Sequence, residues 1–150
     1  GKSCDLMWFF EGWDCVMAAM NGCELNYMEL RQLDERLDYY TPVIITSDAV
    51  IDSDPEMVKA FLRATAKGYA DVIADPDAAA EVLYDHASDY DLEMLKKSQE
   101  YLAEKFMEDT DTWGMMKDEV WDNYSAFLQE YGVISEALPA ADCYTNEFLQ

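Results

Sequence analysis

The chain has 150 residues, of which 10 are Lys or Arg and 32 are Asp or Glu, so its formal net charge is −22. Hydrophobic residues make up 51% of the sequence, which is too many for a disordered acidic tail. We therefore predict a packed acidic domain or a piece of a larger one. Non-specific nucleic-acid binding is close to excluded, and attraction to anionic lipid is excluded, because both require clustered Lys and Arg.

Targeting and metal signals are few. The best apolar runs, 16–20 and 43–45, are far shorter than the ~18 residues of a membrane helix. No signal-peptide pattern is present, and Gly1 resembles an expression scar, so we expect that a natural N-terminal segment has been removed. Four cysteines without a CxxC pair and a single histidine predict no structural metal site, and whether the cysteines are buried thiols or disulfides is left open: Cys4, Cys15, Cys23, Cys143 and His86.

The first third of the chain predicts short strands around one short helix. We expect strands over 4–10, 25–30 and 40–46, because these runs are apolar and aromatic and are bounded by turn residues. The segment 13–21 carries apolar residues on one helical face and predicts a short helix.

The rest of the chain predicts helices. Asp54-Pro55 and Asp75-Pro76 each combine an N-cap carboxylate with proline at the first helical position. A stripe at 3–4 spacing continues from the first of these starts: Val58, Phe61, Leu62, Thr65, Tyr69, Val72 and Ile73. Two further helices are expected from about 91 and over 118–131.

The predicted strands do not make a complete sheet. Val43–Ile45 is apolar on both faces, as in the middle of a covered sheet, yet two or three strands make a poor sheet interior. We expect the missing partners to lie in a removed N-terminal part or in a second copy of the chain.

The densest group of residues with chemical potential is Trp8–Asp14, where a predicted strand becomes a helix. Aromatic rings there can sandwich a flat ligand, and neighbouring carboxylates can accept hydrogen bonds from an amino group. The alternative is that the aromatics belong to the core and the acids cap the helix. The pair Tyr39-Tyr40 before Pro42 either lines a cleft or simply opens the buried strand.

These motifs resemble the thiamine-precursor-binding proteins of ABC importers. The resemblance also covers segments further along the chain: Leu25–Tyr27, Leu37–Thr46, Pro55–Tyr69, Asp75-Pro76, Ser98-Gln99, Trp113-Gly114 and Thr145–Phe148. The wider group includes thiamine-pyrimidine synthases and riboflavin-binding relatives.

The resemblance implies an α/β fold, the mostly helical C-terminal half of a two-lobed periplasmic-binding-protein type 2 architecture with an incomplete sheet. Residues 1–38 would end the second lobe, 39–42 would form the interlobe crossover, and 43–150 would be the C-terminal part of the first lobe. The opening strand and the tryptophan-containing ligand loop of the family are absent from this sequence.

Carried over by position, the resemblance implies that Phe10 stacks on a pyrimidine and that Asp14 accepts from its amino edge. Glu11, Trp13 and Tyr40 would be neighbours of the ligand. Phenylalanine in place of tyrosine and aspartate in place of glutamate depart from the family pattern.

The implied function is the solute-binding component of an ABC importer, which captures a thiamine-related pyrimidine or a similar flat heterocycle, a flavin included. It would be extracytoplasmic, in a bacterium a lipoprotein, with an ABC permease as partner, no cofactor and no catalytic step. Two alternatives remain: a thiamine-pyrimidine-synthase-like enzyme, or a truncated structural oligomer that pairs or swaps through the unpaired sheet edge.

Overall fold

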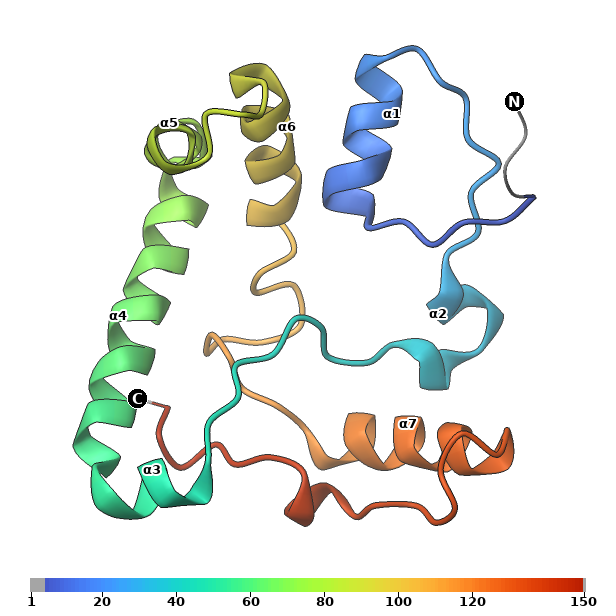
Figure 1. Cartoon of the computed structure of the whole chain (residues 1–150), viewed down its shortest axis with the longest axis vertical. Helices are drawn as coiled ribbons and strands as arrows, with labels where there is room; N and C mark the ends of the chain where they lie inside the picture. Colours follow the sequence, from blue (N-terminus) through green and yellow to red (C-terminus); the bar gives the residue numbers. More distant parts are fainter. Residues whose placement is uncertain (1–4, 150) are drawn as a thin grey trace. The chain divides into compact units, whose positions relative to one another are not determined.

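The computed structural model describes residues 5–149, so Gly1 and Cys4 lie outside the described residues. Two compact units are formed, unit 1 from residues up to 26 together with 67–113, and unit 2 from 27–66 together with 114–150. Figure 1 traces the helices along the chain. In chain order they are η1 (Glu11–Cys15), α1 (Val16–Met20), α2 (Leu30–Leu33), η2 (Glu35–Leu37), α3 (Asp48–Ser53), α4 (Pro55–Ala74), α5 (Pro76–His86), α6 (Leu92–Ala103), α7 (Asp118–Glu130) and η3 (Ala140–Asp142).

The predicted helix starts are confirmed by their caps. The Asp54 carboxylate accepts a hydrogen bond from the backbone N–H of Met57 at 3.0 Å, at the start of α4. The Asp75 carboxylate does the same for Ala78 at 3.0 Å, and α5 begins at Pro76. Each cap satisfies an N–H that has no partner inside its helix, which is why these starts can be recognised locally.

The three predicted strands are wrong for the part of the chain that the structure describes, where every regular element is a helix. Segments 5–10 and 40–46 have no regular secondary structure, and within 25–30 the residue Leu30 opens α2 instead. A strand is defined by hydrogen bonds to a neighbouring strand. Among the described residues, no backbone–backbone hydrogen bond reaches 40–46.

Unit 1 has a small core between two helices. Helices α5 and α6 pack side by side (Figure 1). Between them lie the buried side chains of Ala80, Met94 and Leu95, with Trp13, Leu83 and Tyr84 packed against this cluster. The core therefore holds α6 firmly beside α5.

Unit 2 is organised around α7, which contacts η2 and η3. Ala140 and Ser125 are its buried residues. The Ser125 hydroxyl accepts from the backbone N–H of Leu138 at 2.6 Å, and Asp122 accepts from that of Ala140 at 2.9 Å. The segment that contains Leu138 and Ala140 is thus held against α7 by hydrogen bonds to side chains of that helix.

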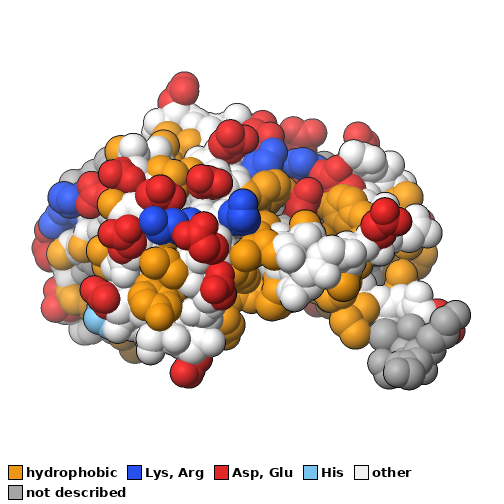
Figure 2. Space-filling model, turned by 90° about the horizontal axis from the view of Figure 1, so that it is seen from above, with side chains coloured by type: hydrophobic (Ala, Val, Ile, Leu, Met, Phe, Trp, Pro, Cys, Tyr) orange, Lys and Arg blue, Asp and Glu red, His pale blue; other side chains and the backbone are white. Residues whose placement is uncertain are grey.

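Large apolar side chains are also exposed. Figure 2 shows hydrophobic side chains among acidic ones on the face drawn there. Leu6 and Ile45 are 75% and 86% exposed. The predicted stripe of α4 is at most half-buried, and Phe61 within it is 54% exposed. None of the helices that the described residues form is both long and apolar enough to cross a membrane.

Candidate functional site

Four of the five predicted site residues lie in one turn of unit 1, which we call the ligand turn (residues 10–15). Two hydrogen bonds of opposite direction join its ends. The Phe10 N–H donates to Oδ2 of Asp14 at 2.8 Å, and the Asp14 N–H donates to the Phe10 carbonyl at 2.8 Å. The turn is π-helical over Glu11–Cys15, a geometry that is rare and often found at functional sites.

The aromatic and acidic groups of the turn differ in exposure. Phe10 is 56% exposed, and its ring meets that of Trp8 edge to face with centroids 6.5 Å apart. Asp14 is half-buried and Glu11 is exposed. An open aromatic ring therefore lies one turn away from a carboxylate, which is an arrangement suited to a flat ligand with an amino edge.

Trp13 points differently from Phe10. Its ring is half-buried against the core cluster of unit 1 and meets Tyr90 edge to face, with centroids 5.0 Å apart. Next to it, burial raises the pKa of the Cys15 thiol, and the charges of Glu11 and Asp14 raise it further. The ligand turn thus packs Trp13 against the core cluster of unit 1 and holds two acidic side chains close to the Cys15 thiol.

The ligand turn is attached to α6 through its middle residue. Gly12 is buried, and its carbonyl accepts a hydrogen bond from the hydroxyl of Ser98 at 2.5 Å. Ser98 is itself 0% exposed. From the sequence, Ser98-Gln99 is only one of the motifs that carry the resemblance, since a contact across 86 residues leaves no local signal.

Tyr40, the fifth predicted residue, belongs to unit 2. Its hydroxyl oxygen accepts from the backbone N–H of Lys117 at 2.9 Å, and its ring is tilted against Trp121 at 6.3 Å between centroids. Tyr39 beside it stacks on Tyr124 at 4.2 Å. The pair therefore packs on α7.

These rings line a small cavity of about 60 Å³ in unit 2, together with Val120: Tyr39, Tyr40, Trp121 and Tyr124. The indole nitrogen Nε1 of Trp121 is buried, with no hydrogen-bond partner among the described residues. The contact of Tyr40 with α7 could not be predicted from the sequence, because hydrophobic spacing indicates which face of a helix is buried and not which segment covers it.

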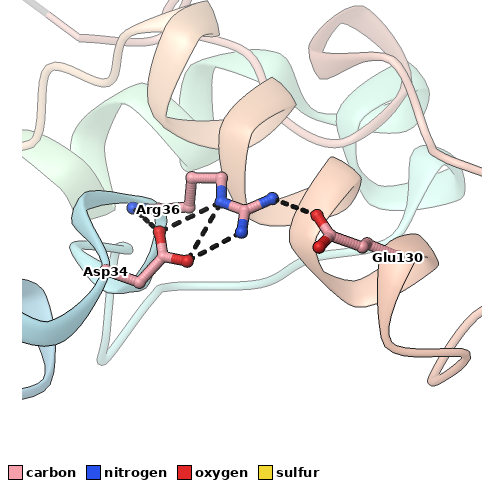
Figure 3. Close-up of polar contacts among 3 residues, drawn as sticks. All are labelled: Asp34, Arg36 and Glu130. Carbon is pink, nitrogen blue, oxygen red and sulfur yellow. Dashed lines mark hydrogen bonds and ion pairs between the residues drawn. The ribbon is translucent and has the colours of Figure 1, made fainter.

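Unit 2 also contains a polar cluster that sequence analysis missed. Figure 3 shows the guanidinium of Arg36 between the carboxylates of Asp34 and Glu130. Its Nη2 donates to Asp34 at 2.7 Å and its Nη1 to Glu130 at 2.6 Å, while its carbon lies 5.1 Å from the centroid of the Phe127 ring. The cluster ties η2 to the end of α7.

No group of three or more His, Cys, Asp or Glu side chains within residues 5–149 is arranged to hold a metal ion. His86 is exposed at the end of α5. Among the described cysteines, Cys15, Cys23 and Cys143 are free thiols.

Comparison with known proteins relates the chain to binding proteins. It is 29% identical over 112 residues to the riboflavin-binding protein RibY of Chloroflexus aurantiacus, an alignment that covers 71% of this chain and 32% of the relative. It is 24% identical over 119 residues to the formylaminopyrimidine-binding protein of Halalkalibacterium halodurans, with 73% and 36% covered. The chain spans about a third of the length of these two curated relatives.

Residues 2–79, just over half of the chain, match the family described as NMT1/THI5 like. This stretch includes the ligand turn and the segment around Tyr40. The resemblance predicted from the motifs is confirmed, and the protein belongs to the NMT1/THI5-like family.

Proposed function

We propose that the protein is the solute-binding component of an ABC importer and that it captures a thiamine-related pyrimidine or a similar flat heterocycle. The observation that carries the proposal is the ligand turn, where two hydrogen bonds through the Phe10 backbone hold Phe10 and Asp14 together. The exposed ring of Phe10 thus lies near the carboxylate of Asp14. The names of the two relatives support the ligand class, because formylaminopyrimidine and riboflavin are both flat nitrogen heterocycles.

In the proposed mechanism Phe10 stacks on the ring and Asp14 accepts from its amino group. Oδ2 of Asp14 is engaged by the Phe10 N–H, whereas Oδ1 has no hydrogen bond to the residues that the structure describes. Oδ1 can therefore accept from the ligand while Oδ2 keeps the carboxylate oriented. Glu11 and Trp13, in the same turn, are proposed as further neighbours, and capture proceeds by closure of two lobes without making or breaking a bond.

The proposed architecture is the C-terminal half of a two-lobed binding protein, with 1–38 ending the second lobe, the crossover at 39–42, and 43–150 in the first lobe. Its support is the unpaired segment Val43–Ile45, whose side chains are 40%, 48% and 86% exposed. A run that is apolar on both faces is suited to the middle of a sheet. We infer that its partner strands come from the rest of a longer chain, and an extracytoplasmic lipoprotein working with an ABC permease remains part of the proposal.

Isothermal titration of the complete protein, with any further segments that it carries, against aminopyrimidines and riboflavin tests the ligand class. Phe10→Leu should weaken binding, because stacking is worth ~0.5–1.5 kcal/mol, or about 2- to 13-fold in affinity. Asp14→Asn should weaken it further, since it replaces a charge-assisted hydrogen bond while it keeps an acceptor for the Phe10 N–H.

Two variants serve as controls. Phe61→Leu alters a ring of matched exposure, 54% against 56% for Phe10, and Asp52→Asn removes an exposed charge in α3. Both should bind as the wild type does. If no aminopyrimidine and no flavin gave a heat of binding, the proposed ligand class would be refuted.

The origin of the missing strands has a separate test. If a second copy of the chain supplied them, light scattering of the 150-residue chain would show a dimer or a larger assembly. A folded, monodisperse monomer would exclude that source and leave the longer chain.

A further inference from the structure

The ligand turn rests on one face of α6. Ser98, Tyr101 and Leu102 are spaced i, i+3 and i+4 along this helix, so their side chains share a face. The Ser98 hydroxyl donates to the Gly12 carbonyl at 2.5 Å, and it is among the most deeply buried polar groups of the described residues. Ser98 therefore reaches the middle of the turn that separates Phe10 from Asp14.

Gly12 allows this contact because it has no side chain. A Cβ at Gly12 would lie 2.7 Å from Cδ2 of Leu102 and 3.1 Å from Cδ1 of Tyr101. Carbon atoms at optimal separation are ~3.5–4.0 Å apart, so a methyl group here would push Leu102 away. The backbone of the ligand turn is thus seated directly on α6.

The helix beneath the turn contributes to the buried core of unit 1. Met94 and Leu95, one turn earlier in α6, are 4% and 0% exposed and pack against Ala80 of α5. The paired hydrogen bonds between Phe10 and Asp14 shape the turn internally, but they do not attach it to the rest of the protein. The attachment includes the packing of Trp13 against the core cluster, the seating of Gly12 and the hydroxyl of Ser98, which donates a hydrogen bond directly to the backbone of the turn.

We propose that Ser98 is a positioning residue for ligand binding, which holds Phe10 and Asp14 in place through the carbonyl of Gly12. The inference rests on the proposed function, since it assigns Ser98 a role in that same site. A site whose binding groups are already fixed loses less conformational freedom when the ligand arrives, so it binds more tightly than the same groups on a loose turn.

Ser98→Ala tests the proposal, with Ser53→Ala as the matched control, because the Ser53 hydroxyl donates to a carbonyl on the exposed helix α3. The first readout is hydrogen exchange of the Phe10 and Asp14 amides, measured by NMR without ligand. Loss of one neutral hydrogen bond is expected to speed exchange at both amides about fivefold and to leave α5 amides unchanged. The second readout is affinity for an aminopyrimidine in the complete protein, which should fall by a similar factor.

Ser98→Cys keeps a weak donor of similar size and should restore part of both effects, which also covers the case in which the alanine variant folds poorly. Exchange at Phe10 and Asp14 that matches the Ser53→Ala control would overturn the proposal. A uniform acceleration of amide exchange across α5 and α6 would also overturn it, because it would show that the substitution destabilises unit 1 as a whole. Selective acceleration in a protein that binds no heterocycle would refute the proposed function and leave the anchoring of the turn by Ser98 standing.

Discussion

Leu95→Ala should destabilise the protein more than any surface substitution. Leu95 is 0% exposed, and only three other apolar residues of the described chain are classed as buried: Ala80, Met94 and Ala140. Truncation removes the transfer free energy of the side chain and leaves a cavity between α5 and α6. For buried leucines the sum is about 2–5 kcal/mol, a large part of the ~5–15 kcal/mol by which domains are stable.

The measurement is urea unfolding followed by far-ultraviolet circular dichroism. A loss of about 3 kcal/mol lowers the midpoint by about 1–3 M, given slopes of about 1–3 kcal/mol per molar urea for small proteins. Leu33→Ala is the control, because this leucine of α2 is 65% exposed and should cost less than about 1 kcal/mol. If both variants shift the midpoint equally, the cluster around Leu95 is not the core that stabilises unit 1.

Three further predictions concern polar contacts. The hydrogen bond that its hydroxyl donates to Asp118 raises the pKa of Tyr144 to about 12, so its stabilising effect is present below pH 10 and is lost as the pH rises through about 12. Asp118→Asn should return this pKa toward 10 in an ultraviolet titration. Asp75→Ala removes the cap of α5 and should cost about 0.5–2 kcal/mol, measured by urea unfolding. Hydrogen bonds from the guanidinium of Arg36, followed by one from its backbone N–H, lower the pKa of Asp34, and Arg36→Lys, which removes the guanidinium, should raise it in an NMR titration.

Each of these has an outcome that contradicts it. Tyr144 titrating alike in the wild type and in Asp118→Asn would show that the pair does not form in solution. Asp89→Ala, which changes an exposed acid in the loop before α6, is the control for Asp75→Ala. If both variants lose the same free energy of unfolding, Asp75 does not stabilise α5 as a cap. A carboxyl whose pKa is lowered in the folded state stabilises the fold at pH values above its ordinary pKa, and this stabilisation is lost on acidification. The Arg36→Lys variant should therefore also unfold at a higher pH than the wild type in an acid titration. An unchanged acid transition would refute the role of the cluster.

Local chemistry explains what could be predicted. The starts of α4 and α5 follow from Asp54-Pro55 and Asp75-Pro76, because a cap and a fixed φ act within one turn of the chain. Phe10 and Asp14 were grouped because they lie in one short segment and match positions of the family motif, whereas the π-helical turn that joins them was not predicted. The family resemblance was readable for the same reason, because it is carried by contiguous motifs.

Strand pairing was not predictable in this way. The composition of 40–46 describes a run that would suit a sheet, but a strand exists only where another strand accepts and donates its backbone hydrogen bonds. Among residues 5–149 that partner is missing, so the same side chains are exposed instead of buried.

The sequence by itself determined the acidic, largely helical character of the chain, its capped helix starts, its family and the residues of the ligand turn. Only the tertiary structure decided what holds that turn. The Ser98 hydroxyl donates a hydrogen bond to the Gly12 carbonyl, 86 positions away. In unit 2, likewise, the Arg36 guanidinium donates to the Glu130 carboxylate, 94 positions away. Contacts between residues so far apart depend on how whole helices pack, and side-chain spacing along one segment carries no record of which other segment will cover it.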